Sequence, residues 1–308
     1  MKRLLSAAGL AALLTACSRS GGYGHADGDA ASDADVDGDS EQDGDAARDG
    51  SGDGSAQPDG DQGREWCTID LVFAVDDSSS MGEELRAFRE DVWPAFATAL
   101  AEVAGGVDGP PFRAAVLDAC PDPASFHTRG QGGACSFESG EVWMDSSSSD
   151  LVGEFQCVGD IDSSDALCSG DNDDEQPASA AATALEPPWN APGGANWGFL
   201  REEALLIVIA ITDEDEQPRP AVPAQSIFDR IVAVKGGVSR VVFLGIGGAS
   251  DCSGPYGEAN EARTLMAVTE GFIAEGHGVF WDLCQGQLED GLTSAMTTIE
   301  LACSEMVY

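Results

Sequence analysis

The feature that most constrains this 308-residue chain is a short apolar run that ends abruptly in carboxylates and hydroxyls. Residues 71–75 read Leu-Val-Phe-Ala-Val, and residues 76–80 continue as Asp-Asp-Ser-Ser-Ser. An unbroken apolar run bounded by turn residues is typical of a strand buried on both faces of a parallel sheet. Because Asp76, Ser78 and Ser80 are spaced two apart, three hard oxygen donors can point the same way, which suits Mg²⁺ or Mn²⁺. A Ser/Asp helix cap is the simpler interpretation, but a cap needs only one such residue.

This segment resembles the first loop of the metal-ion-dependent adhesion site of von Willebrand factor A domains, whose pattern is Asp-x-Ser-x-Ser after the first buried strand. Asp76, Ser78 and Ser80 match that pattern, and Met81-Gly82 also fits the family's habit. The resemblance implies that these residues hold a divalent ion, Mg²⁺ or Mn²⁺, at the top of the sheet. It further implies that a protein or polysaccharide ligand donates a carboxylate to the open coordination position of that ion.

Residues 204–211, the most strongly apolar strand candidate of the chain, repeat the design of the first strand. The sequence Thr-Asp-Glu-Asp-Glu follows directly at 212–216. Ligands of open α/β sheets bind outside the carboxyl ends of the strands, so we expect Asp213 to lie near Asp76. In the resembled family this strand carries the third loop, and the aspartate of that loop matches Asp213. Asp215 is a further candidate ligand.

The second loop departs from the family, which places a metal-binding threonine just before a helix that here begins near Pro177. Residues 170–176 read Gly-Asp-Asn-Asp-Asp-Glu-Gln and contain no threonine. A carboxylate from Asp173, Asp174 or Glu175 is one substitute, and its extra negative charge would favour Ca²⁺. The alternative is that this loop only caps the helix while water completes the coordination shell.

The rest of the chain alternates between helical and strand-like segments. Apolar residues recur at helical spacing in the longer segments, and short apolar runs separate them. The expected helices cover 83–103, 149–155, 177–185, 222–235, 258–275 and 288–301, and the further expected strands cover 112–117, 141–144, 240–246 and 278–281. Such alternation predicts an α/β fold, with a doubly wound, mostly parallel sheet flanked by helices. This Rossmann-like pattern agrees with the von Willebrand factor A fold that the resemblance implies.

The first 16 residues read as a signal peptide, because two basic residues precede an apolar stretch of about half the ~20 residues that a membrane span needs. Residues 14–17, Leu-Thr-Ala-Cys, resemble a bacterial lipobox, in which Cys17 becomes the lipidated first residue. By resemblance to bacterial lipoproteins, Ser18 implies anchoring in the outer membrane of a Gram-negative cell envelope. Ordinary signal cleavage that leaves a free Cys17 is the alternative.

A long acidic segment separates this anchor from the rest of the chain. Residues 24–63 hold 13 acidic side chains against a single arginine. Such a composition cannot bury enough apolar surface to fold, so we expect a disordered, extended Asp/Gly/Ala tether over 17–64. The stretch 65–308 has the size of one domain and would form the von Willebrand factor A-like fold.

The chain is strongly acidic, with a formal net charge of -40 at pH 7. The stretch 65–308 alone holds 42 acidic against 10 basic residues. This charge repels nucleic acid and anionic membrane surfaces, so neither is an expected binding partner. A cationic ligand, a basic protein surface or a divalent ion is favoured, while extreme acidity also serves solubility alone.

Eight cysteines besides Cys17 indicate disulfides, because an even number in an exported chain is typical of a disulfide framework. No Cys-x-x-Cys pair occurs and histidine is scarce, which argues against a zinc site. Sequence spacing does not fix the pairing. Cysteines that lie close together in the sequence give two expected pairs. A disulfide that joins the two ends of the domain gives a third, and the two remaining cysteines form the fourth. The expected pairs are Cys120–Cys135, Cys157–Cys168, Cys67–Cys303 and Cys252–Cys284.

Three functions are compatible with these residues. The first is a cell-envelope lipoprotein that binds a ligand through its metal site. The second is a metal-dependent hydrolase that uses the same Asp/Ser cluster, and the third is a structural envelope protein with a vestigial site. A serine hydrolase is disfavoured because no Gly-x-Ser-x-Gly elbow occurs. The resemblance to von Willebrand factor A domains implies the first of the three functions, so we expect a binding protein and not an enzyme.

Overall fold

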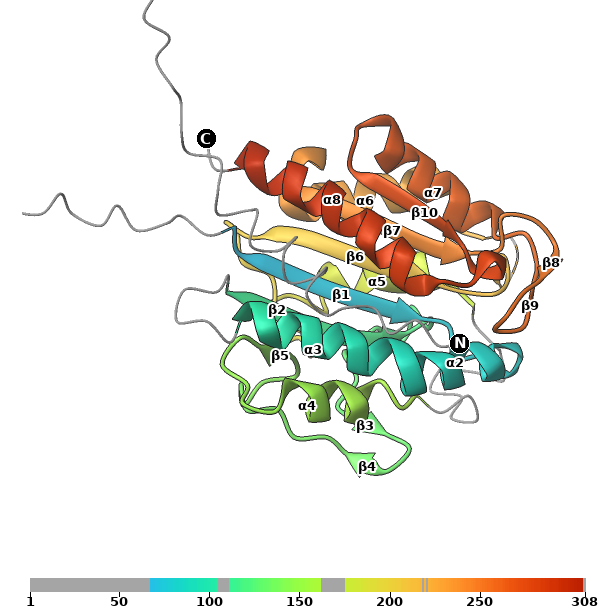
Figure 1. Cartoon of the computed structure of the whole chain (residues 1–308). Helices are drawn as coiled ribbons and strands as arrows, with labels where there is room; N and C mark the ends of the chain where they lie inside the picture. Colours follow the sequence, from blue (N-terminus) through green and yellow to red (C-terminus); the bar gives the residue numbers. More distant parts are fainter. Residues whose placement is uncertain (1–66, 105–110, 162–174, 218, 220, 307–308) are drawn as a thin grey trace, which may run out of the picture. The chain divides into compact units, whose positions relative to one another are not determined.

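A central six-stranded sheet, in the order β10-β7-β6-β1-β2-β5, organises the structure (Figure 1). The computed structural model describes residues 67–104, 111–161, 175–217, 219 and 221–306, so the expected signal peptide, Cys17 and the acidic tether lie outside it. Neighbouring strands run parallel except β5, which pairs antiparallel with β2. The predicted doubly wound, mostly parallel sheet is confirmed. The strands are β1 (Ile69–Val75), β2 (Phe112–Asp118), β5 (Met144–Asp145), β6 (Leu205–Ile211), β7 (Val241–Gly247) and β10 (Gly278–Asp282).

The point at which the strand order reverses lies between β1 and β6. From β1 the chain moves to β2 on one side, and from β6 it moves through β7 to β10 on the other. Val72 of β1 pairs with Ala115 of β2 and with Val208 of β6. Every residue of β1 and β6 is buried, which explains the two unbroken apolar runs of the sequence. The carboxyl ends of these two strands therefore flank the place where open sheets bind ligands.

Helices cover both faces of this sheet (Figure 1). Because side chains alternate along a strand, Phe73 packs in one core cluster with α3, α4 and α8, whereas Val72 and Ala74 pack in the other with α5, α6 and α7. None of the described helices is long and apolar enough to cross a membrane. The helices are α2 (Gly82–Ala87), α3 (Trp93–Ala104), α4 (Leu151–Val158), α5 (Pro177–Leu185), α6 (Ala224–Lys235), α7 (Arg263–Ala274) and α8 (Leu288–Met306).

Short elements fill several connections and displace two predicted boundaries. The helix expected over 258–275 begins only at Arg263, because β9 pairs with β8 as a small antiparallel ribbon. The strand expected over 141–144 is reduced to β5, which pairs with β2 over two residues. The short elements are η2 (Ser79–Met81), the π-helical turn η3 (Phe88–Val92), β3 (Arg129–Gly130), β4 (Gly133–Ala134), η4 (Val238–Arg240), β8 (Cys252–Ser253), β9 (Glu258–Ala259) and η5 (Leu283–Gln285).

Two of the predicted disulfides are present. Cys67–Cys303 joins the segment before β1 to the last turns of α8, and Cys252–Cys284 joins β8 to η5. The first closes a loop of 236 residues, so it constrains the unfolded chain strongly.

The other two predicted pairs, Cys120–Cys135 and Cys157–Cys168, are wrong. Cys135 is bonded to Cys157, with 5.8 Å between their Cα atoms. The physical reason is tertiary packing, since the β3–β4 ribbon lies against the end of α4. A Cβ atom at Gly130 would fall 2.0 Å from the carbonyl oxygen of Cys157. Cys120 is also disulfide-bonded, and Cys168 lies outside the described residues.

Candidate metal centre

The first loop is fixed at the carboxyl end of β1 by the buried side chain of Asp76. Its backbone N–H donates to the carbonyl of Ile211 at 2.9 Å, which ties the loop to the end of β6. The carboxylate accepts a hydrogen bond from the Ser78 N–H at 2.8 Å and one from the Thr212 hydroxyl at 2.6 Å. Asp76 is completely buried, so its orientation is set by these partners from both loops.

The two serines of the motif connect the first loop to the third. The hydroxyls of Ser78 and Ser80 lie 2.9 Å apart. The Ser80 hydroxyl donates to Oδ1 of Asp213 at 3.3 Å, and Asp213 is only 2% exposed. The structure thus brings together four of the candidate side chains, Asp76, Ser78, Ser80 and Asp213, in one connected group of carboxylates and hydroxyls.

Two carboxyls of this edge have raised pKa values. The pKa of Asp213 is raised to about 7, first by burial and second by the nearby charge of Asp76. The hydrogen bond from Ser80 only partly opposes this shift. Burial, followed by the charges of Asp118 and Asp76, raises the pKa of Asp77 to about 7. Within the described residues no arginine or lysine forms an ion pair with Asp213. A bound cation would relieve this repulsion, and the hard oxygen donors suit Mg²⁺, Mn²⁺ or Ca²⁺.

The acidic edge extends to the end of β2, which sequence reasoning missed. Asp118 is 3% exposed, and its Oδ2 lies 2.9 Å from Nε2 of His127. Its other oxygen accepts the Cys120 N–H at 2.9 Å. The sequence signal was present, because Asp118, like Asp76, comes directly after an apolar residue at the end of a strand.

A further buried carboxyl, Glu84, lies on α2 beside this group. It is 1% exposed, and its Oε2 has no hydrogen-bond partner within the described residues. Burial is the largest cause that raises its pKa, and the charges of Glu83 and Asp76 add to it. Gly257 packs against it so closely that a Cβ there would fall 2.2 Å from Oε1 of Glu84. No pattern in the sequence separates this glutamate from its exposed neighbour Glu83.

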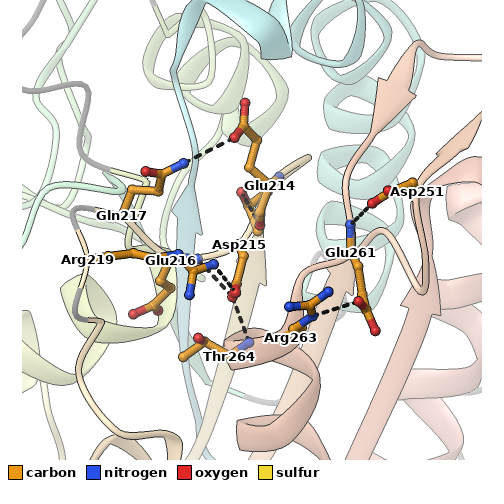
Figure 2. Close-up of polar contacts among 10 residues, drawn as sticks. Glu214, Asp215, Glu216, Gln217, Arg219, Asp251, Glu261, Arg263 and Thr264 are labelled. Carbon is orange, nitrogen blue, oxygen red and sulfur yellow. Dashed lines mark hydrogen bonds and ion pairs between the residues drawn. The ribbon is translucent and has the colours of Figure 1, made fainter.

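Asp215, a candidate ligand in the sequence, is engaged by α7 (Figure 2). One of its oxygens accepts a hydrogen bond from the Thr264 N–H at 2.8 Å, and the other accepts one from Nη2 of Arg219 at 2.5 Å. Burial tends to raise the pKa of Asp215, but these hydrogen bonds outweigh burial and hold it below its usual range.

The next residue, Glu216, accepts hydrogen bonds from the first turn of α5, as Asp215 does from the first turn of α7. Glu216 is fully buried and accepts the N–H of Ser179 at 3.2 Å and its hydroxyl at 2.8 Å. Asp215 and Glu216 therefore fix the third loop on the first turns of two helices. This attachment holds Asp213 in place.

The second loop is described only at its end. Asp173 and Asp174 lie outside the described residues. Glu175 is 6% exposed, and its backbone exchanges two hydrogen bonds with Gln217, of 3.3 and 3.2 Å. The end of the second loop thus lies beside the third loop, on the side of Glu216.

One other group of ligand-type atoms occurs, at β8 and η5. Among the described residues, Cys252, Asp282 and Cys284 bring three His, Cys or carboxylate ligand atoms within 4.8 Å of one another. The two sulfurs are joined in a disulfide and are not thiolates, so this group does not offer a cysteine metal site. The oxygen-rich group at the ends of β1 and β6 is the better candidate.

Comparisons with known proteins give distant structural likenesses. No protein-family model matches the chain, and no curated protein sequence does. A crystal form of proximal thread matrix protein 1 from the mussel byssus is 15% identical over 77% of this chain and 49% of its own, with a TM-score of 0.43. A structure of that protein with a zinc-occupied MIDAS motif is 15% identical over 77% of this chain and 48% of its own, with a TM-score of 0.40. The chain thus spans about half the length of the protein it matches.

Proposed function

We propose that this chain is a metal-dependent, adhesion-type binding protein of the von Willebrand factor A kind. The observation that carries the proposal is the connected group of Asp76, Ser78, Ser80 and Asp213 at the strand-order reversal. Its donors are all hard oxygens, and Asp213 has a pKa raised to about 7 by burial and neighbouring negative charge. Such a group is stabilised by a divalent cation.

Each residue of the group would have its own role at the ion. Asp76, Ser78 and Ser80 hold the ion, Mg²⁺ or Mn²⁺, directly or through water, while Asp213 binds it or orients a bound water. When bound, the ion supplies an open coordination position that accepts a carboxylate. The ligand is a protein or polysaccharide that carries that carboxylate. Additional carboxylates from the second loop would favour Ca²⁺ instead.

The proposed setting is the cell envelope of a Gram-negative bacterium. Cys17 would carry the lipid anchor in the outer membrane, and the acidic tether would hold the domain away from the membrane surface. The disulfides of the domain are compatible with an oxidising compartment outside the cytoplasm. In this setting the protein captures its ligand without turning it over.

The proposal is tested by the water-proton relaxation of Mn²⁺ bound to the full chain. An adhesion-type site leaves at least one exchangeable water on the ion, so relaxation is enhanced, and acetate, as a carboxylate probe, lowers it by displacing that water. The variant Asp76→Ala abolishes the enhancement. Glu83→Gln, which removes an exposed carboxylate beside the same loop, retains it.

A bound Mn²⁺ whose relaxation does not respond to acetate would contradict an open coordination position. Equal enhancement in wild type and Asp76→Ala would show that the ion binds elsewhere.

A further inference from the structure

A cavity of about 620 Å³ lies at the amino edge of the sheet, that is, where the parallel strands begin, opposite the metal centre. Its walls are the ends of α5 and α6, the segment that enters β6, and η4 just before β7. This volume is within the range of sites that bind small organic ligands. The apolar part of the lining includes Leu185, Leu200 and Val234, and the polar part includes Asn190.

The charge of this lining is opposite to that of the rest of the domain. Arg201, Lys235 and Arg240 line the cavity, and Glu202 is the one acidic residue among them. The stretch 65–308 as a whole holds 42 acidic residues against 10 basic ones. Three of those ten cations therefore gather around one cavity.

The three cations differ in the groups that they contact among the described residues. Arg201 forms an ion pair with the buried Asp70 at 2.8 Å. Lys235 instead donates to the backbone carbonyl of Arg201 at 2.5 Å, and Arg240 donates to the backbone carbonyl of Glu202. Within the described residues neither Lys235 nor Arg240 forms an ion pair. Lys235 is only 6% exposed, and burial lowers its pKa, while the charges of Asp70 and Glu203 oppose that shift.

We infer that this cavity binds an organic carboxylate that carries an apolar stem. The guanidinium of Arg240 has five N–H groups, and only one donates within the described residues, so most of its donors are available. A carboxylate placed there would accept hydrogen bonds from Arg240, while Leu200 and Val234 would contact the stem. Inorganic phosphate lacks a stem for the apolar half of the lining, and the acidic domain repels polyanions such as nucleic acid.

The test compares N-acetyl-leucine with its neutral isostere N-acetyl-leucinamide by calorimetry on the full chain. A chelator keeps divalent ions away, so the result does not depend on the proposed metal site. We expect the acid to bind about tenfold more tightly than the amide, because a charge-assisted hydrogen bond is lost in the amide. Hexanoate distinguishes two sources of the ligand. Weaker binding than N-acetyl-leucine indicates a peptide carboxyl terminus, and equal binding indicates a simple aliphatic acid.

Variants separate a binding role from a purely structural one. Arg240→Gln should weaken N-acetyl-leucine binding by about tenfold, and Glu202→Gln should strengthen it by about threefold because it removes the repelling carboxylate. Arg86→Gln removes an exposed cation elsewhere and should change nothing. Equal affinity for acid and amide, no binding of either, or equally strong binding of phosphate would overturn the inference. A failure of Glu202→Gln to strengthen binding would also overturn it.

Discussion

Asp70 and Asp213 are both almost completely buried, at opposite edges of the same sheet, and their surroundings differ in charge. Asp70 stands near the start of β1, where its carboxylate accepts Nε of Arg201 at 2.8 Å and the backbone N–H of the same residue at 2.7 Å. Asp213 stands just after β6, where the Ser80 hydroxyl donates to it at 3.3 Å and the charges of Asp76 and Glu84 act against its ionisation.

The difference shows which buried carboxylate has a cationic partner from the chain itself and which does not. Burial raises the pKa of Asp70, but the charge and hydrogen bonds of Arg201 oppose that shift. Burial and like charge together raise the pKa of Asp213, and only a hydroxyl hydrogen bond opposes them. An ionised carboxylate in such a place is stabilised by a cation from outside the chain. The buried Asp70 is therefore paired within the chain, whereas the group at the carboxyl edge is suited to a metal ion.

The largest effect is expected for Arg201→Met. This variant leaves Asp70 buried without its cation, so the free energy of unfolding should fall by about 3–5 kcal/mol in chemical denaturation. The affinity for Mn²⁺ should not change, because the substitution is at the amino edge. Arg89→Met is the matched control, since its ion pair with Asp160 is at the surface and contributes ~1 kcal/mol or less. Equal losses in both variants would contradict the difference between the edges.

An increase in the free energy of unfolding, instead of a decrease, is expected for Asp213→Asn in the absence of metal. Without metal at pH 8, removing a buried charge that repels its neighbours should raise the free energy of unfolding by roughly 1–3 kcal/mol. The same substitution should abolish the stabilisation that Mn²⁺ gives the wild type. Thermal unfolding with and without Mn²⁺ measures both effects. A destabilised metal-free variant would show that the Asp213 carboxylate is needed for the fold itself.

Metal affinity should increase with pH. Asp213 has a folded-state pKa of about 7, above the ordinary 3.8, so the metal-free folded protein retains a proton that the unfolded chain has lost. Its contribution to metal-free stability is therefore complete below the ordinary value and declines as pH rises through about 7. Because the ion displaces that proton, Mn²⁺ affinity should rise about tenfold per pH unit below pH 7 and level off above it. Calorimetry at pH 5.5, 6.5 and 7.5 tests this, and a flat profile would contradict it.

The smallest effect is expected for Glu214→Gln. Glu214 is only half-buried, and its charge is the last of the causes that raise the pKa of Asp213. Exposed charges are screened by water, so Mn²⁺ affinity should change by less than about threefold. A tenfold loss in calorimetry would place Glu214 among the residues that bind the ion.

The sequence predicted the long strands β1, β2, β6, β7 and β10, and the approach of the first and third loops, because local composition determines them. The apolar runs that became β1 and β6 can only be buried, and parallel pairing then brings Asp76 and the start of the third loop to the same edge. The bounds of α5, Pro177–Leu185, followed from helical spacing and from proline in the first turn.

The remaining features depend on packing between distant segments. Pairing of Cys135 with Cys157 follows from the contact of the β3–β4 ribbon with α4, which spacing cannot indicate. Burial of Glu84 depends on the approach of Gly257, far away in the sequence. The attachment of the third loop through Glu216 likewise depends on where α5 begins in space.

Calorimetric titration of the full chain with Mn²⁺ at pH 7.5, in wild type, Asp76→Ala and Glu83→Gln, tests the metal centre most directly. We predict that wild type and Glu83→Gln bind one ion with the same affinity and that Asp76→Ala loses affinity by at least about 100-fold, since it removes a fully buried carboxylate of the proposed site. Binding of Mn²⁺ that is unchanged in Asp76→Ala would contradict a metal centre at the ends of β1 and β6.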